Sequence, residues 1–167
     1  MKLLEIYGVT VLLPIVTFML GFIVSRFTMT KKERLDFAQV QFNNAKALME
    51  ARHARFQEFT TAMKRYATKT EEPDLDDFFQ IATTGENYFY QLKITGDAIL
   101  SGKVDSKSRD NTLVPAIEEA ITKSLPTFYQ TLQSIARRKD YSYHGVLKRE
   151  NYESLYAAVE KFGKPKP

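Results

Sequence analysis

The sequence predicts an all-α fold, in which a single N-terminal transmembrane helix precedes an antiparallel bundle of the four-helix type with one long helix. Residues 6–27 are mostly apolar and carry no charge before Arg26, which is the length that a helix needs to cross a bilayer. Residues 35–66 place apolar side chains at alternating intervals of three and four, the spacing of one helix face. Later segments repeat this spacing, and none alternates with period two for long enough to predict a sheet.

The composition limits the chemistry of the chain. Its 167 residues suit a single domain, and 24 Lys and Arg against 20 Asp and Glu give a net charge of +4, well short of a nucleic-acid-binding tail. There is no cysteine, which excludes disulfides and thiolate metal sites. The sequence has no phosphate-binding glycine loop, no HExxH and no nucleophile elbow. We therefore expect no metal and no cofactor, and the residues do not favour an enzyme.

The N-terminal apolar segment predicts three divisions of the chain: an anchor over residues 1–29, a bundle over 30–163 and a tail over 164–167. A cleaved signal peptide is the alternative, but residues 24–27 form a poor cleavage site. Basic residues flank the span on its C-terminal side, as the positive-inside rule requires of a cytoplasmic flank. They are Arg26, Lys31, Lys32 and Arg34. We expect a plasma (inner) membrane protein with its short N-terminus outside and its bundle in the cytoplasm.

Small and weakly polar residues recur along one face of the predicted membrane helix. They are Thr10, Pro14, Thr17, Gly21, Ser25 and Thr28. Such a stripe lets membrane helices approach closely, although the same residue types are also common in membrane helices that have no partner. The stripe predicts a membrane-helix interface, and hence a homo-oligomer or a complex of membrane proteins.

The longest helix is predicted over residues 35–66, and its apolar face forms a heptad seam. The seam consists of Leu35, Ala38, Phe42, Ala45, Met49, Arg52, Phe56, Phe59, Met63 and Tyr66. Arg52 alone is not apolar: it either extends its guanidinium past the seam edge into water or fixes the register of the bundle. The helix either continues from the membrane span or breaks near residues 27–30, where Thr30 and Glu33 form a capping-box pattern.

A second helix is predicted from about Pro73 to Gly102, antiparallel to the first. Acidic residues before and within its first turn suit a positive helix N-terminus better than a metal site. They are Glu71, Glu72, Asp74, Asp76 and Asp77. Gly85 and Gly96 occupy the apolar face of this helix. Because glycine disfavours helix, we expect these positions to admit a bulky neighbour such as Phe56 or Phe59.

Two further helices complete the predicted bundle. Residues 103–111 are predicted to be a short charged loop or a frayed turn. A third helical period then covers 114–135, with a kink or a junction at Pro126. Residues 140–145 are predicted to be a loop before a short amphipathic helix that begins near Leu147 and ends at Gly163.

Basic and aromatic residues are concentrated between residues 137 and 149. The basic members are Arg137, Arg138, Lys139, Lys148 and Arg149. With Tyr141, Tyr143 and His144 they are of the types that stack on bases or bind phosphates, and they equally suit anionic lipid or a solvated loop. This segment is a possible patch for an anionic partner, and nucleic acid is weakly supported.

Arg137 or Arg138 with His144 matches the R-x4-6-H spacing, which resembles the motif of HEPN-superfamily ribonucleases. The resemblance implies an RNA phosphodiester as substrate. It covers only residues 137–144 and the all-helical class, and a basic residue stands after the arginine where the family has a polar one. The alternative is that these residues end a helix and that His144 lies in a loop.

The sequence thus favours a single-pass membrane protein whose cytoplasmic bundle is a non-enzymatic interaction, signalling or assembly subunit. One alternative is a membrane-tethered HEPN-like ribonuclease or nucleic-acid-binding effector that uses Arg138 and His144. Another is an extracytoplasmic sensor domain on a signal anchor, against which the basic flank argues.

Overall fold

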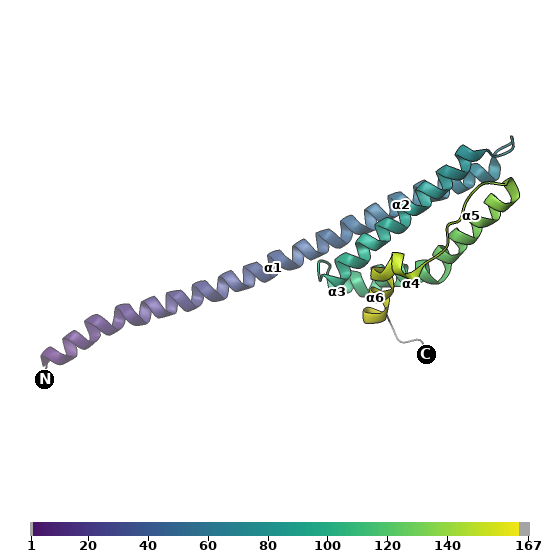
Figure 1. Ribbon diagram of the computed structural model, residues 1–167. Helices are drawn as coiled ribbons and strands as arrows, with labels where there is room; N and C mark the ends of the chain where they lie inside the picture. Colours follow the sequence, from purple (N-terminus) through teal and green to yellow (C-terminus); the bar gives the residue numbers. More distant parts are fainter. Residues whose placement is uncertain (1, 164–167) are drawn as a thin grey trace. The chain divides into compact units, whose positions relative to one another are not determined.

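The computed structural model describes the backbone of residues 2–163 and the side chains of residues 17–25 and 30–163, and it is all-α over that part of the chain. Its helices are α1 (Lys2–Thr68), α2 (Leu75–Leu100), α3 (Ser106–Ser108), α4 (Val114–Glu119), α5 (Leu125–Lys139) and α6 (Glu153–Phe162) (Figure 1). Two π-helical turns, η1 (Arg109–Leu113) and η2 (Ala120–Ser124), and a 3-10 turn, η3 (Arg149–Tyr152), lie between them. The chain forms two units, Met1–Gln39 and Val40–Pro167, which are described separately.

The first unit consists of the N-terminal part of α1. Its backbone is helical through residues 27–30, so the alternative of a break before Thr30 was wrong. Most of the predicted membrane span, residues 6–27, lies outside the residues whose side chains are described. Within the described residues no helix contains a stretch that is both long and apolar enough to cross a membrane. The large apolar side chains described there, from Phe18 to Val24, are exposed.

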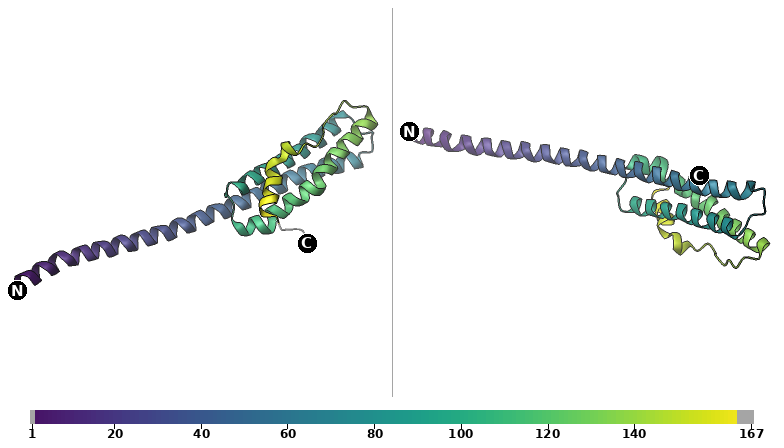
Figure 2. Two further views of the ribbon diagram at one scale, coloured as in Figure 1. Left: turned by 60° about the horizontal axis from the view of Figure 1, so that its bottom comes forward. Right: turned by 90° about the horizontal axis from the view of Figure 1, so that it is seen from above.

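The second unit is built on an antiparallel hairpin of α1 and α2, as the sequence predicted (Figures 1 and 2). Asp74 begins α2 as its N-cap, and it forms a reciprocal capping box with Asp77. The helix ends beside Gly102, whose φ of 67° is readily adopted only by glycine. Near that end Gln41 and Asn44 of α1 donate hydrogen bonds to the carbonyls of Gly102 and Lys103, at 2.7 and 3.1 Å.

Helices α3 to α5, with their two π-turns, form the next part of the bundle. In the segment predicted as a loop or a frayed turn, residues 103–105 precede α3 and residues 106–111 are helical. The Asp105 side chain caps α3 by accepting a hydrogen bond from the Ser108 amide at 2.9 Å. Pro115 and Pro126 each follow a π-turn. The widened turn accommodates a proline ring that would clash in a regular α-helix. The irregularity expected at Pro126 is therefore the turn η2.

The last helix begins later than predicted. Residues 141–148, here called the strap, have no regular secondary structure, and η3 and α6 follow them. The strap packs on α2 because Tyr141 and Tyr143 place their rings 5.4 and 5.6 Å from that of Phe78. Its Gly145 carbonyl accepts a hydrogen bond from Gln133 of α5 at 2.8 Å. α6 ends at Gly163, as expected.

One face of α2 is buried in the core, and its buried side chains include Phe78, Phe89, Leu92 and Ile99. Gly85 and Gly96 are buried, and they admit close neighbours as predicted, although the neighbours differ. A Cβ at Gly85 would overlap the Phe128 ring of α5, and one at Gly96 would lie 2.9 Å from the Ser154 carbonyl oxygen of α6. The nearest neighbours are thus not Phe56 and Phe59, which the sequence suggested.

The seam of α1 is covered from Ala45 onward, except at Phe56, which is exposed. Ala45 is fully buried, and Met49, Phe59, Met63 and Tyr66 are partly buried against the core. By contrast Phe42 is 50% exposed and Leu35 is 63% exposed. The bonds from Gln41 and Asn44 to the end of α2 mark where the hairpin ends. The predicted seam is therefore longer than the part that the bundle covers.

Candidate functional site

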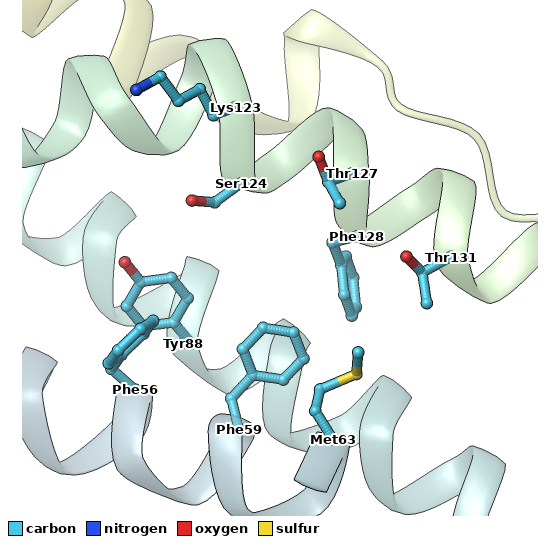
Figure 3. A pocket seen from close by; sticks show the side chains of 9 residues that line it. All are labelled: Phe56, Phe59, Met63, Tyr88, Lys123, Ser124, Thr127, Phe128 and Thr131. Atoms are coloured by element: carbon cyan, nitrogen blue, oxygen red, sulfur yellow. The ribbon is translucent and has the colours of Figure 1, made fainter. Parts of the chain in front are cut away.

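An aromatic groove lies between α1 and the segment that joins α4 to α5 (Figure 3). It consists of two adjoining cavities of about 310 and 240 Å³. Both are lined by Phe56, Tyr88 and Ser124. The larger cavity lies within the lower part of the range of small-molecule sites, about 300–1,000 Å³.

The groove exists because long side chains on α1 face short ones on the opposite wall. Ser124 of η2 and Thr127 and Thr131 of α5 recur three and four residues apart and therefore share one helix face. In Figure 3 these three residues lie on the wall across from Phe59 and Met63. Serine and threonine side chains are too short to fill the space up to the aromatic residues, so a groove remains between the two walls.

Aromatic rings form the floor of the larger cavity. The Phe59 ring is stacked on Tyr88, with centroids 6.3 Å apart, and meets Phe128 edge-on at 5.6 Å. Phe56 lies 5.4 Å from Tyr88 and is 44% exposed. Because Gly85 has no Cβ, the Phe128 ring can lie against α2 and complete this floor. The floor is rigidly packed, and Phe56 presents apolar surface to solvent.

The smaller cavity is more polar, and most of the ionisable side chains of the groove line it. They are Arg52, His53 and Glu119, with Lys123 on the rim of the larger cavity. Lys123 lies 3.8 Å from Glu119 in an exposed ion pair. Within the described part of the chain, Arg52 has no ion-pair partner, and it is half-buried. Counting His53 as neutral, these groups sum to one positive charge.

Burial raises the pKa of Tyr88 at the centre of the groove, while the positive charge of Arg52 lowers it and Glu119 raises it. The Tyr88 hydroxyl is therefore a neutral hydrogen-bonding group at physiological pH. Among the described residues no group of three or more His, Asp and Glu is placed to hold a metal ion. The residues that converge here are suited to binding an apolar molecule with one polar end.

Sequence reasoning named only part of this groove. The sequence predicts that four of the groove residues belong to the seam of the long helix: Phe56, Phe59, Met63 and Arg52. For Arg52 it leaves two interpretations, a guanidinium extended into water or a residue that fixes the register of the bundle. The structure places Arg52 on the groove wall, and both interpretations stay predictions. Ser124, Thr127 and Thr131 were missed. Their helical spacing was the available signal, but it cannot show which side chains lie opposite.

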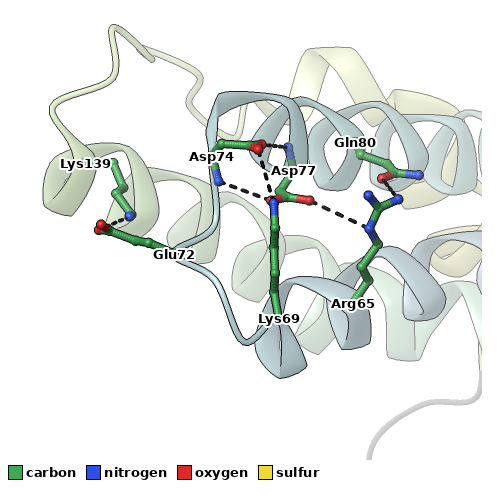
Figure 4. A network of polar contacts seen from close by, with 7 residues as sticks. All are labelled: Arg65, Lys69, Glu72, Asp74, Asp77, Gln80 and Lys139. Atoms are coloured by element: carbon green, nitrogen blue, oxygen red, sulfur yellow. Dashed lines mark hydrogen bonds and ion pairs between the residues drawn. The ribbon is translucent and has the colours of Figure 1, made fainter.

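A second polar cluster holds the tip of the hairpin together (Figure 4). Asp77, whose side chain is 4% exposed, pairs closely with Lys69 and lies 3.8 Å from Arg65. Lys69 also pairs with Asp74 at 3.1 Å, and each of the two aspartates accepts a hydrogen bond from the amide of the other. The acidic residues Asp74 and Asp77 thus serve the N-terminus of α2, as the sequence predicted.

Ion pairing sets the protonation of this cluster. The Asp77 amide and Lys69 lower the pKa of Asp74 to about 2. Hydrogen bonds to Asp77 and Asp74 raise the pKa of Lys69. Lys139, at the end of α5, pairs with Glu72, lowers the pKa of that carboxyl and has its own pKa raised. The cluster therefore joins α1, α2 and α5 structurally.

The predicted anionic-partner patch is partly occupied by internal contacts. Lys139 pairs with Glu72, and Arg149 pairs with Glu160 while lying 4.6 Å above the Tyr156 ring. Arg137, Arg138 and Lys148 are exposed. Tyr141 and Tyr143, which were weighed as base-stacking residues, instead pack on Phe78. The exposed basic surface is thus smaller than the sequence implied.

The residues of the HEPN-like alternative do not converge in the structure. Arg137 and Arg138 lie exposed at the end of α5, and His144 is exposed in the strap. Within the described part of the chain, no hydrogen bond or ion pair joins either arginine to the histidine. The ribonuclease assignment stays a prediction.

The predicted membrane-facing residues are described only in part. Thr17, Gly21 and Ser25 are exposed on α1, as are Lys31, Lys32 and Arg34 of the basic flank. No atom lies within 4 Å of the Cβ position at Gly21. The side chains of Thr10, Pro14, Thr28 and Arg26 lie outside the described residues. The membrane-helix interface stays a prediction.

No protein-family model, curated protein or solved structure matches this chain. The assignment of function therefore depends on the fold and on the surfaces described above.

Proposed function

We propose that this chain is a single-pass membrane-anchored protein, whose helical bundle is a non-enzymatic interaction or assembly subunit. The observation that carries the proposal is a run of exposed large apolar side chains on the N-terminal part of α1. They are Phe18, Met19, Leu20, Phe22, Ile23 and Val24, each at least 50% exposed. Exposed apolar surface of this extent marks a contact with membrane or protein.

The bundle does not need this segment to complete its core. The largest fully buried side chains, among them Phe89, Leu92 and Ile117, all belong to residues 81–155. The exposed apolar residues from Phe18 to Val24 are not among these core side chains. With the uncharged sequence that surrounds them, they support a bilayer as their environment.

The charges that flank this segment give the proposed orientation. Lys31, Lys32 and Arg34 are exposed on α1 after it. Because basic residues are retained on the cytoplasmic side, the bundle is placed in the cytoplasm and the short N-terminus outside, in the plasma (inner) membrane. A reporter that is active only in the cytoplasm, fused after Pro167, tests this orientation. Activity only of a reporter that requires export would contradict it.

Membrane insertion is tested by extraction of cell membranes at alkaline pH. The wild-type chain should stay in the pellet, because its apolar segment lies in hydrocarbon. The variant Leu20→Lys/Ile23→Lys should move to the soluble fraction, since each charge at this depth costs about 3 kcal/mol. The matched control Leu35→Lys/Phe37→Lys alters exposed apolar residues of α1 outside the segment and should stay in the pellet. Release of the wild-type chain would overturn the anchor.

Association through the membrane helix is the second part of the proposal. Thr17, Gly21 and Ser25 lie on one face of α1 by their spacing. Gly21→Leu should lower the mass of the detergent-solubilised complex, because the larger side chain separates the helices. Leu20→Ala, on a neighbouring face, should leave the mass unchanged. A wild-type chain that is monomeric and without a partner would contradict this part.

A further inference from the structure

The geometry points to the aromatic groove as a binding site for an amphiphilic monoanion: a single alkyl chain that ends in a carboxylate. This inference is independent of the membrane anchor, because every residue that carries it belongs to the bundle. It assigns a ligand class to a surface that the proposed interaction role does not use.

The apolar end of the groove suits the alkyl chain. Phe59, Met63 and Phe128 line the larger cavity, of about 310 Å³, and Phe56 remains 44% exposed beside it. Covering this surface removes apolar area from water, which favours binding at roughly 25 cal/mol per Å². The unbranched thioether of Met63 can adjust to a flexible chain.

The polar end suits a carboxylate. Arg52 is half-buried on the wall of the smaller cavity, and no ion pair with another described residue neutralises it. Lys123 is paired only loosely with Glu119, at 3.8 Å. The resulting single positive charge matches one anionic head group, and the planar guanidinium of Arg52 can bind a carboxylate through two hydrogen bonds.

The hydroxyl groups between the two ends also favour this ligand. Ser124 lines both cavities, and Thr127 lies beside it on α5 (Figure 3). Ser124 can donate a hydrogen bond to the carboxylate, while the Thr127 methyl group can contact the chain. A neutral or cationic amphiphile would leave Arg52 uncompensated, so the groove selects the anion.

The test uses the full-length chain in lipid nanodiscs and measures octanoate binding by equilibrium dialysis, with empty nanodiscs subtracted. We expect saturable binding of one octanoate per chain, weaker binding of octanol and the weakest binding of octylamine. Arg52→Gln should weaken octanoate binding about tenfold, equivalent to about 1.4 kcal/mol, because it removes a charge-assisted hydrogen bond to the carboxylate. It should leave octanol binding unchanged. The control Arg55→Gln removes an exposed arginine of the same helix that pairs with Glu58, and it should bind octanoate as the wild-type chain does.

A second pair of variants tests where the alkyl chain of the ligand binds. Thr127→Phe fills the groove and should abolish the binding of both octanoate and octanol. Gln130→Phe places the same side chain at an exposed position of α5 that does not line the groove and should bind normally. Circular dichroism checks that all variants are folded. Equal binding of octanoate and octanol to the wild-type chain, or undiminished binding to folded Thr127→Phe, would overturn the inference.

Discussion

The Phe128 ring of α5 occupies the space where a side chain at Gly85 of α2 would begin, so any larger residue at this position would force the ring to shift. This contact completes the aromatic floor of the groove and fixes the distance between α2 and α5. The stability of the bundle and the shape of the groove therefore depend on the same pair of residues.

Replacing Gly85 by alanine should destabilise the bundle. Overpacking against Phe128 costs about 1–3 kcal/mol, while the better helix propensity of alanine offsets about 1 kcal/mol. Thermal unfolding followed by circular dichroism measures the difference. Thr83→Ala, at an exposed position of the same helix, is the control. The double variant Gly85→Ala/Phe128→Leu should show a smaller loss than the sum of the single variants, and additive losses would contradict the direct contact.

Asp77→Asn should loosen the tip of the α1–α2 hairpin. The asparagine can still accept the hydrogen bond from the Asp74 amide, but the charge that Lys69 and Arg65 face is lost. We expect a loss of about 1–2 kcal/mol in the free energy of unfolding. Asp76→Asn alters the exposed neighbour in the same helical turn and should change stability little. Equal effects of the two substitutions would show that helix-terminal charge alone matters.

The bundle should lose stability in acid between about pH 4 and pH 2. The pKa of Asp74 falls from its usual 3.8 to about 2 in the folded chain, through the Asp77 amide and Lys69. A carboxyl whose pKa is lower in the folded chain than in the unfolded chain stabilises the fold at pH values above its unfolded pKa. This stabilisation is lost as the pH falls through the pKa of the folded chain. The midpoint of urea unfolding, measured from pH 6 to pH 2, should therefore decline.

The variant Asp74→Asn distinguishes the contribution of Asp74 to acid destabilisation from that of the other carboxyl groups. Asparagine is a good N-cap residue, so α2 should still form, but the acid-dependent part of the decline should become smaller. Glu71→Gln, at an exposed position nearby, should retain the wild-type dependence on pH. A decline that is identical in Asp74→Asn and wild type would remove Asp74 from the acid response.

Tyr143 should resist ionisation until strongly alkaline pH. Burial of the strap against Phe78 raises the pKa of Tyr143 to about 12. The folded chain thus favours the neutral phenol of Tyr143. This preference stabilises the fold fully below pH 10, the usual pKa of tyrosine, and is lost as the pH rises through about 12. The ultraviolet absorbance of phenolate should show a late-titrating group that is absent in Tyr143→Phe. Tyr90→Phe, at a residue that is 62% exposed, is the control and should leave the late-titrating group in place.

The sequence by itself determined the all-α class, the span of α2 and the positions where it starts and stops. These features depend on local chemistry: apolar side chains at intervals of three and four, aspartates that cap a helix N-terminus, and a glycine that permits a positive φ. The same local chemistry predicted that Gly85 and Gly96 admit close neighbours. It also predicted that an irregularity falls at Pro126.

Only the tertiary structure decided which residues face one another. Periodicity shows that Ser124, Thr127 and Thr131 share a face, but not that this face lies opposite Phe59 and leaves a groove. It likewise assigned Leu35 to a covered seam, although the covered part begins at Ala45 because the hairpin ends near Gln41. Tyr141 and Tyr143 sit in a segment without helical spacing, so their packing on Phe78 depends on contacts distant in sequence. Such pairings follow from the packing of whole helices, and no single segment encodes them.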